Sequence, residues 1–140
     1  VLFRSVELRF AAPGEVLDEH FAKASIYWHA AGLGSDLQQH PDRAEHFGIA
    51  PVEAMSAGAV PVVFDAAGPG SVVRHDIDGL KYRTLDGLVE CTERLISQPE
   101  LRARLSESAR VRSRDFDQQH FEDHVRALVS SVLEQPLRAD

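Results

Sequence analysis

Two carboxylates, Glu45 and Glu53, stand on either side of a seven-residue stretch and are the side chains best placed for chemistry. Pro51 favours the first turn of a helix because it lacks an N–H, and Gly58 is typical of a helix end. The sequence therefore predicts a helix that begins near Gly48. A helix start carries unpaired N–H groups and partial positive charge, which suits it to bind an anion, typically phosphate.

The two glutamates would then lie on opposite sides of the bound anion. Glu45 precedes the predicted helix, and Glu53 lies about five residues inside it, roughly 7 Å along the axis at ~1.5 Å per residue. A carboxylate is a poor partner for phosphate but a good acceptor for sugar hydroxyls. The spacing therefore suits a ligand with a sugar on each side of a phosphate bridge, such as a nucleotide-sugar.

The order of the predicted elements indicates an α/β fold. The run AVPVVF at 59–64 is apolar without alternation, as in a parallel-sheet strand covered on both faces. Other predicted strands lie at 6–10, 25–30 and 80–83. Because helical patterns separate these strands, we expect a Rossmann-like, mostly parallel sheet with helices on both faces, followed by a helical C-terminal tail.

Local signals predict where several elements end. Gly79, in the turn RHDIDG, is expected to take a positive φ. Ser97-Gln-Pro-Glu100 matches a capping box that would start a helix.

An apolar stripe marks the last helix, and it either stays partly exposed or packs on this domain's own sheet. The stripe consists of Phe121, Val125, Leu128 and Val132.

The composition of the chain disfavours several classes of function. A length of 140 residues predicts one domain, and a formal charge of -7 disfavours a nucleic-acid surface or peripheral membrane binding. No apolar run approaches the ~18 residues of a membrane-spanning helix, and no signal peptide is visible. Cys91 is the sole cysteine, which excludes an internal disulfide and a cysteine-based metal site. We expect a cytoplasmic protein.

The segment EHFGIAPVEAMSAGAVPVVF resembles the E-x7-E signature of the retaining glycosyltransferases of family four, the group-1 glycosyl transferases. These enzymes have the GT-B architecture of two Rossmann domains. SIYWHAAGLG before the signature, GLKYR after it and the helical tail extend the resemblance over about residues 6–134. VLFRS resembles a translated sequencing-adapter end, so we expect residues 1–5 to be non-native. Residues 6–140 would form the C-terminal nucleotide-sugar-binding domain of a longer two-domain protein.

The resemblance also implies roles for particular residues. Glu45, the catalytic candidate, would contact hydroxyls of the transferred sugar, and Glu53 would contact the ribose. Backbone N–H groups of the next loop would bind the sugar and diphosphate, and a neighbouring histidine would line the sugar pocket. These donor-binding residues are His46, Phe47, Gly48 and Ile49. The Phe47 side chain itself is equally compatible with a core position.

The second glycine-rich segment, 68–71, matches the family less well. Its glycines could cradle an anion through the backbone. Alternatively the segment is a turn in which Ser71 caps a short helix. The family usually has a second glycine at Ala67 and a glutamate at Ser71, and both departures weaken a donor-binding role for this loop.

The family uses no metal for its chemistry, so we expect neither a metal site nor a cofactor, with a nucleotide-diphospho-sugar as the donor substrate. His29, His40 and His46 match no zinc-ligand spacing. The acceptor would bind an N-terminal domain, and an Arg and a Lys upstream of this chain would neutralise the leaving diphosphate. The fragment alone would then be inactive. The alternatives are a non-catalytic nucleotide-binding module, or a phosphorylase or epimerase of the same architecture.

Overall fold

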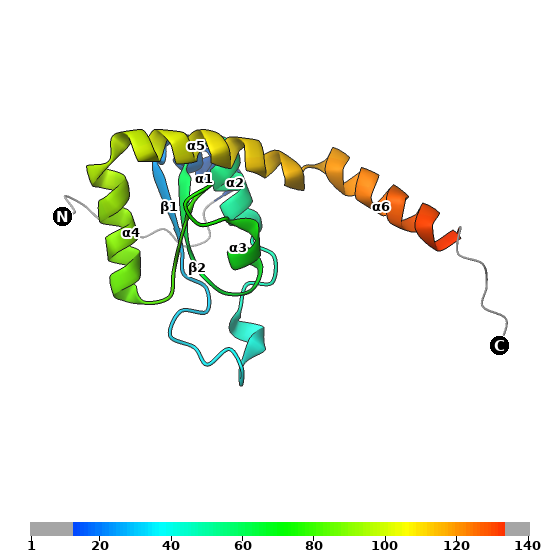
Figure 1. Cartoon of the computed structure of the whole chain (residues 1–140), viewed down its shortest axis with the longest axis horizontal. Helices are drawn as coiled ribbons and strands as arrows, with labels where there is room; N and C mark the ends of the chain where they lie inside the picture. Colours follow the sequence, from blue (N-terminus) through cyan, green and yellow to red (C-terminus); the bar gives the residue numbers. More distant parts are fainter. Residues whose placement is uncertain (1–12, 134–140) are drawn as a thin grey trace.

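The computed structural model describes residues 13–133, so the strand expected at 6–10 and the expected adapter residues 1–5 lie outside the described part (Figure 1). The strands are β1 (Ile26–His29), β2 (Val60–Phe64) and β3 (Leu80–Tyr82). The α-helices are α1 (Gly14–Lys23), α2 (Ile49–Ala57), α3 (Ala67–Val72), α4 (Leu85–Ser97), α5 (Pro99–Ser113) and α6 (Gln118–Leu133). Short 3-10 helices are η1 (Pro41–Arg43) and η2 (Arg114–Phe116).

The described strands form a parallel sheet in the order β1-β2-β3. Val62 of the central strand is in register with Trp28 on one side and Leu80 on the other. The first four residues of β2 are buried, which explains why AVPVVF shows no polar alternation. The predicted parallel α/β fold is confirmed.

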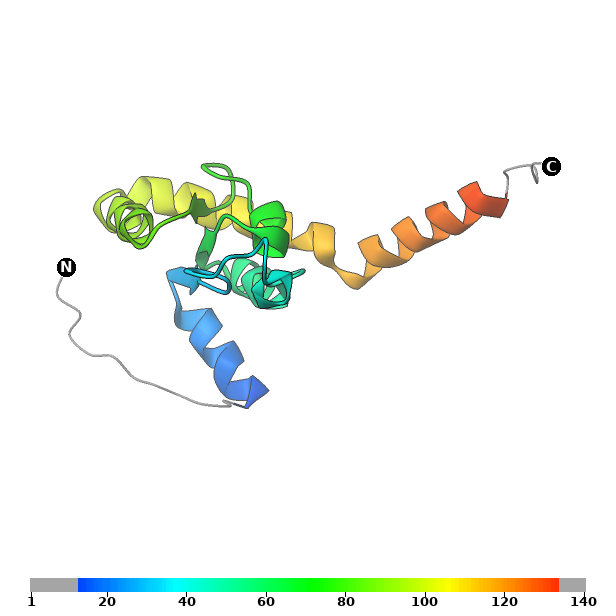
Figure 2. The same cartoon turned by 90° about the horizontal axis from the view of Figure 1, so that it is seen from below.

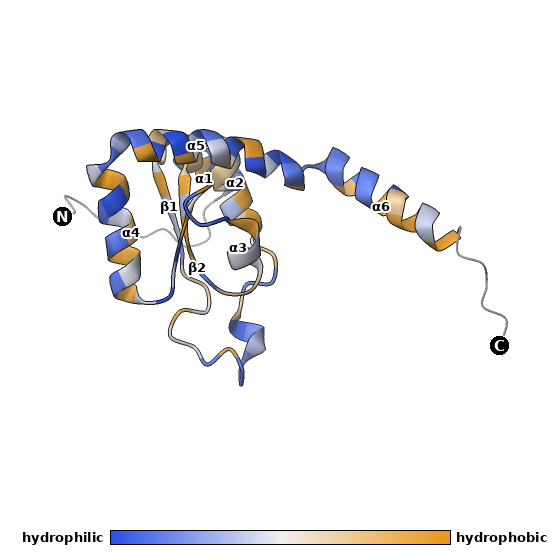
Figure 3. Cartoon of the chain, in the orientation of Figure 1, coloured by the Kyte–Doolittle hydropathy of each residue, from blue (hydrophilic) through white to orange (hydrophobic). Residues whose placement is uncertain are grey.

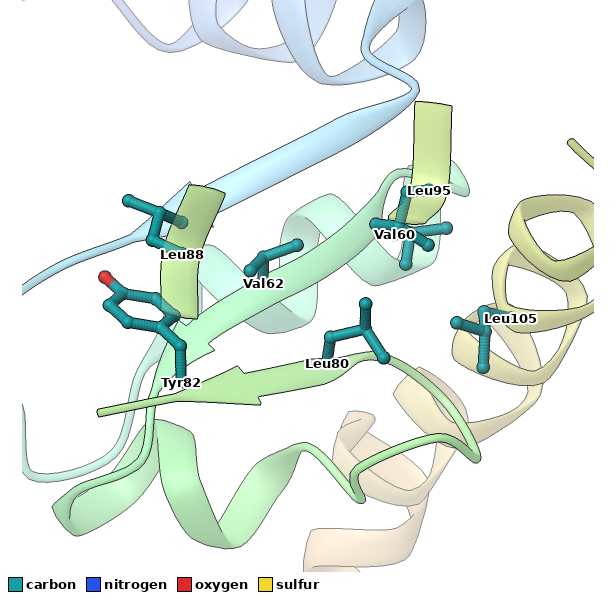
Figure 4. Close-up of a cluster of buried hydrophobic side chains, with 7 residues drawn as sticks. All are labelled: Val60, Val62, Leu80, Tyr82, Leu88, Leu95 and Leu105. Atoms are coloured by element: carbon teal, nitrogen blue, oxygen red, sulfur yellow. The ribbon is translucent and has the colours of Figure 1, made fainter. Parts of the chain in front are cut away.

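Helices cover both faces of this sheet. On one face, side chains of β2 and β3 pack against Leu88 and Leu95 of α4 and Leu105 of α5 (Figure 4). On the other face, Met55 of α2 packs with Val63 of β2 and with residues of α3 and α5. Residues alternate between the two clusters along β2 because successive side chains of a strand point to opposite faces.

The last helix, α6, extends away from the layered body in both views (Figures 1 and 2). Hydrophobic positions recur along it, yet none of its residues is buried (Figure 3). Phe121 is 69% exposed and Leu128 is 64% exposed. The alternative that this stripe packs on the domain's own sheet is therefore wrong.

The expected positive φ at Gly79 is also wrong, because Asp76 takes that conformation in the turn, with φ 63°. A side chain at Gly79 would overlap Pro61 and Val73. The glycine allows the start of β3 to pack closely on β2 rather than forming a left-handed turn.

The capping box at Ser97 does not form. Helix α4 runs to Ser97, whose hydroxyl donates to the carbonyl of Glu93 at 2.7 Å in its own helix. Gln98 is the N-cap of α5 and makes no side-chain cap, although Pro99 lies in the first turn as expected. Because the Ser97 hydroxyl bonds to a carbonyl of its own helix, it does not cap the start of the next helix.

Candidate functional site

Helix α2 begins where the sequence predicts. Gly48 is its N-cap with φ 94°, and Gly58 ends it with φ 93°, both in the left-handed region that favours glycine. No side chain caps the start of α2, so the first-turn N–H groups keep their capacity to bind an anion. Glu53 is the fifth residue of the helix, as expected.

The loop before α2 lies directly against the start of α3. The amide of Gly68 donates to the carbonyl of Glu45 at 3.0 Å. A side chain at Gly68 would overlap the backbone of His46 and Phe47, so only glycine permits this approach. These loops follow the carboxyl ends of β1 and β2, the edge of a parallel sheet where open α/β domains bind ligands.

A cavity of about 340 Å³ opens between these two loops and η2. It is lined by His46, Phe47, Ala67, Gly68, Ser71, Val72 and Phe116. Phe47 is 48% exposed, and its ring meets that of Phe116 edge-on at 5.9 Å. Phe47 is therefore a wall of this cavity and not part of the core.

Two residues define the start of α3, one by its side chain and one by its backbone. Ser71 does not cap the helix: its hydroxyl donates to the carbonyl of Ala67 within α3, and the N-cap is Ala66 without a side-chain bond. Ala67 adopts φ 45°, a conformation that L residues other than glycine rarely take. The residue that replaces the family's usual glycine is thus held in a glycine-like conformation.

Both signature carboxylates are exposed. Glu45 Oε1 accepts from the amide of Phe47 at 3.3 Å, which directs the carboxylate along the loop. Tyr27 of β1 lies near both glutamates: burial raises the pKa of its phenol, and the charges of Glu53 and Glu45 raise it further. Nothing local in the sequence shows which face of β1 meets the loop that carries Glu45.

His29 occupies the same face of β1, two residues further on. Burial lowers the pKa of its imidazole, and the nearby charge of Glu45 opposes that shift. Its Nδ1 is buried without a hydrogen-bond partner among residues 13–133, while its carbonyl accepts from the Tyr82 hydroxyl at 2.9 Å. The strand thus carries two polar aromatic groups toward the signature, which sequence reasoning did not assign to the site.

Two cations near α3 share a single carboxylate. Lys81 Nζ and Arg83 Nη2 contact the Asp65 carboxylate at 2.8 and 2.9 Å, and hydrogen bonds from Lys81 and Arg83 lower the pKa of Asp65 despite its partial burial. Lys81 also donates to the carbonyl of Gly70. Neither cation lines the cavity beside Phe47. Arg112, which pairs with Asp115, lies over the ring of Phe116 at the wall of this cavity, 4.6 Å from the ring centroid.

No cluster of three or more His, Cys, Asp or Glu residues suited to a metal ion occurs among residues 13–133. No helix in that part of the chain combines the length and the apolar character needed to cross a membrane.

These features define a parallel α/β domain with a cavity near the carboxyl ends of its strands. The family model of glycosyl transferases group 1 matches residues 8–112, three quarters of the chain, and the chain belongs to that family.

Two curated relatives carry the name GDP-Man:Man(3)GlcNAc(2)-PP-Dol alpha-1,2-mannosyltransferase. The protein from Dictyostelium discoideum is 30% identical over 134 residues, which is 95% of this chain and 24% of the relative. The protein from Xenopus laevis is 31% identical over 122 residues, 84% of this chain and 23% of the relative. The chain thus spans about a quarter of the length of these relatives.

A solved structure gives a third comparison. The crystal structure of Anabaena HepE in complex with UDP aligns with a TM-score of 0.57 and 26% identity, covering 62% of this chain and 25% of HepE. The shared fold agrees with the family assignment.

Proposed function

We propose that this chain is the C-terminal, donor-binding half of a glycosyltransferase that moves a sugar from a nucleotide-diphospho-sugar to an acceptor with retention. The observation that carries the proposal is the pair Glu45 and Glu53 on either side of the uncapped start of α2. The names of the two mannosyltransferase relatives and the UDP in complex with HepE support it.

In this proposal the start of α2 receives the diphosphate. The N–H groups of Ile49 and Ala50 and the helix dipole would bind its oxygens, and Gly48 allows the backbone to approach closely. Glu53, the fifth residue of α2, would accept hydrogen bonds from the ribose. Glu45, at the loop, would accept them from the sugar, with His46 and the Phe47 backbone beside it.

The chemistry assigned to these residues is mainly orientation and electrostatic stabilisation. Glu45 would hold the sugar so that the leaving phosphate helps guide the acceptor to the same face. The start of α2 would stabilise part of the charge that develops on the leaving group. The remainder would come from an Arg and a Lys in the preceding part of the protein, because Lys81 and Arg83 are committed to Asp65. We propose no metal in this mechanism.

The full protein would add an N-terminal acceptor domain, with the active site between the two domains. Residues 6–140 alone would bind the donor without transferring the sugar. We propose a cytoplasmic location for this half of the protein.

Calorimetric titration of the full-length protein with UDP-, GDP- and ADP-sugars, and with the matching nucleoside diphosphates, tests the proposal. Glu53→Ala should weaken nucleoside diphosphate binding by about 1.5–3 kcal/mol, because a charge-assisted hydrogen bond is lost. Glu93→Ala, which removes an exposed helical carboxylate on α4, is the matched control. Unchanged affinity of Glu53→Ala for the nucleoside diphosphate would show that Glu53 does not contact it.

A product assay on the same full-length protein separates the remaining possibilities. Sugar transfer with the anomeric configuration kept would support the retaining transferase. Donor binding without turnover for any acceptor class would favour a binding module.

A further inference from the structure

A second cavity lies at the opposite end of the sheet from the candidate donor site. Ser25 immediately precedes β1, and Gly58 lies just before β2, so this cavity is at the amino ends of the strands. Its volume is about 310 Å³. It is lined by Ala22, Lys23, Ala24, Ser25, Ala57, Gly58, Pro99, Arg102, Ala103, Ser106 and Arg110.

The lining of this amino-end cavity is cationic. Lys23, Arg102 and Arg110 contribute positive charge, and no Asp or Glu is among the residues that line it. This local excess contrasts with the chain's formal charge of -7. Lys23 contacts Glu19, whereas neither arginine has an ion-pair partner within the described residues. The cavity is therefore lined by two guanidinium groups that form no ion pair with a carboxylate of the described residues.

Both guanidinium groups are held by backbone carbonyls. Arg102 Nη1 donates to Leu95 at 3.0 Å, and Arg110 Nη2 donates to Ala57 at 3.2 Å. A side chain at Gly58 would overlap the Arg110 guanidinium, so glycine lets this group lie against the backbone. Since a guanidinium has five N–H donors and each arginine uses one, most donors remain free for a ligand.

Neighbouring groups add hydrogen-bonding capacity to the amino-end cavity. The start of the 15-residue helix α5, at Pro99, borders the cavity, and no side chain caps it. Such a helix start favours anions. Ser25 adds a hydroxyl, and the Ser106 hydroxyl donates to the carbonyl of Gly58 at 2.6 Å, which joins α5 to the end of α2. The alternative is that the arginines only cap the carbonyl ends of α2 and α4.

We infer that the amino-end cavity is an oxyanion site for a phosphate group, separate from the donor site. Planar guanidinium groups bind phosphate oxygens through paired hydrogen bonds, and two of them line this cavity beside a helix start. A free phosphate compound and an anionic lipid headgroup present the same phosphate oxygens. Because the cavity lies at the far end of the strands, a ligand here would leave the cavity beside Phe47 open.

Hydrogen exchange of the full-length protein, followed by mass spectrometry during titration with inorganic pyrophosphate, tests this inference. Peptides that contain Gly58 and Ser106 should gain protection saturably. The double substitution Arg102→Gln and Arg110→Gln removes charge but keeps an amide donor, and should raise the titration midpoint about tenfold or more. Arg104→Gln is the matched control, because Arg104 lies on the same helix and donates to one carbonyl outside the cavity.

Ala103→Glu provides a second variant that leaves both arginine contacts intact. Ala103 is an exposed lining residue, so the new carboxylate would repel the anion without breaking a cap. It should abolish the pyrophosphate response even if the double variant fails to fold. No saturable protection in the wild type, full protection in Ala103→Glu, or an equal loss in Arg104→Gln would each overturn the inference.

Vesicles identify the source of the phosphate group. Flotation is compared between vesicles of phosphatidic acid with phosphatidylcholine and vesicles of phosphatidylcholine alone. Binding to the acidic vesicles that Ala103→Glu removes would support a lipid headgroup. Pyrophosphate protection without vesicle binding would support a soluble phosphate compound.

Discussion

The amide of Gly68 donates to the carbonyl of Glu45 at 3.0 Å, and this bond joins the two loops of the candidate donor site. Glu45 and the start of α3 are separated by a helix and a strand in the sequence. Because the contact is between backbones, the position of the first signature carboxylate depends on the absence of a side chain at residue 68. The candidate donor site therefore depends on a glycine outside the segment from Glu45 to Glu53.

Gly68→Ala should destabilise the 140-residue chain by about 1–3 kcal/mol, since the new methyl group would overlap the backbone of His46 and Phe47. Urea unfolding measures the change. Gly14→Ala is the control, because among the described residues no atom outside its own helix and chain neighbours lies within 4 Å of its added Cβ, and it should be neutral or slightly stabilising. Equal stability of Gly68→Ala and wild type would mean that the two loops separate easily.

Glu45→Ala should mainly lower turnover of the full-length enzyme, with little change in nucleoside diphosphate affinity. In the proposed site Glu45 contacts the sugar, which the free diphosphate lacks, and contacts made mainly in the transition state act on kcat. Steady-state kinetics and calorimetry together check this. Parallel loss of affinity for the diphosphate and the sugar donor would contradict the assignment.

Ala67→Gly should stabilise the chain by about 0.5–1 kcal/mol. The left-handed conformation costs an L residue about 1–2 kcal/mol, and the greater freedom of glycine in the unfolded state offsets part of the gain. Ala67 has φ 45° and is exposed, so no buried contact is lost. Thermal unfolding measures the effect, and Ala103→Gly, in the interior of α5, should destabilise instead.

Asp65→Asn should change the pH dependence of stability. Hydrogen bonds from Lys81 and Arg83 lower the pKa of Asp65 below its ordinary value of 3.8. The carboxylate therefore contributes stability that is fully present above that ordinary value and is lost as pH falls through the lower, folded-state pKa.

Unfolding at a series of pH values should show wild type and Asp65→Asn differing at neutral pH and converging in acid. Asp18→Asn, which removes an exposed carboxylate of α1 that takes part in none of the described ion pairs, should show no such convergence. A difference between wild type and Asp65→Asn that persists below the folded-state pKa would mean that the carboxylate charge is not the cause.

Helix α6 should be the least protected helix in the 140-residue chain. Its stripe is exposed, with Val125 at 43% and Val132 at 61%, so packing contributes little to its stability. Hydrogen exchange should be faster after Phe121 than in β2, unless the chain associates through this stripe. Sedimentation at two concentrations distinguishes these cases. Strong protection in a monomer would contradict the prediction.

The sequence by itself determined the features that depend on local chemistry. Pro51 and Gly58 placed the ends of α2 because their backbone preferences act within a few residues, and the buried run at 59–64 indicated a parallel strand. The spacing of Glu45 and Glu53 likewise required only helix geometry. The capping box predicted at Ser97 does not form. Its hydroxyl can bond either to its own helix or to the start of the next one, and the sequence pattern alone does not decide between them.

Only the tertiary structure decided which distant groups meet. Tyr27 and His29 lie beside the signature because β1 pairs with β2, and Gly68 supports Glu45 because α3 starts against the preceding loop. The same packing brings Arg102 and Arg110 of α5 to the end of α2. Each contact joins residues far apart in the chain, and a one-dimensional pattern carries no information on which faces pack together. The exposure of α6 was also decided at this level, because an apolar stripe predicts a buried face but not the surface that covers it.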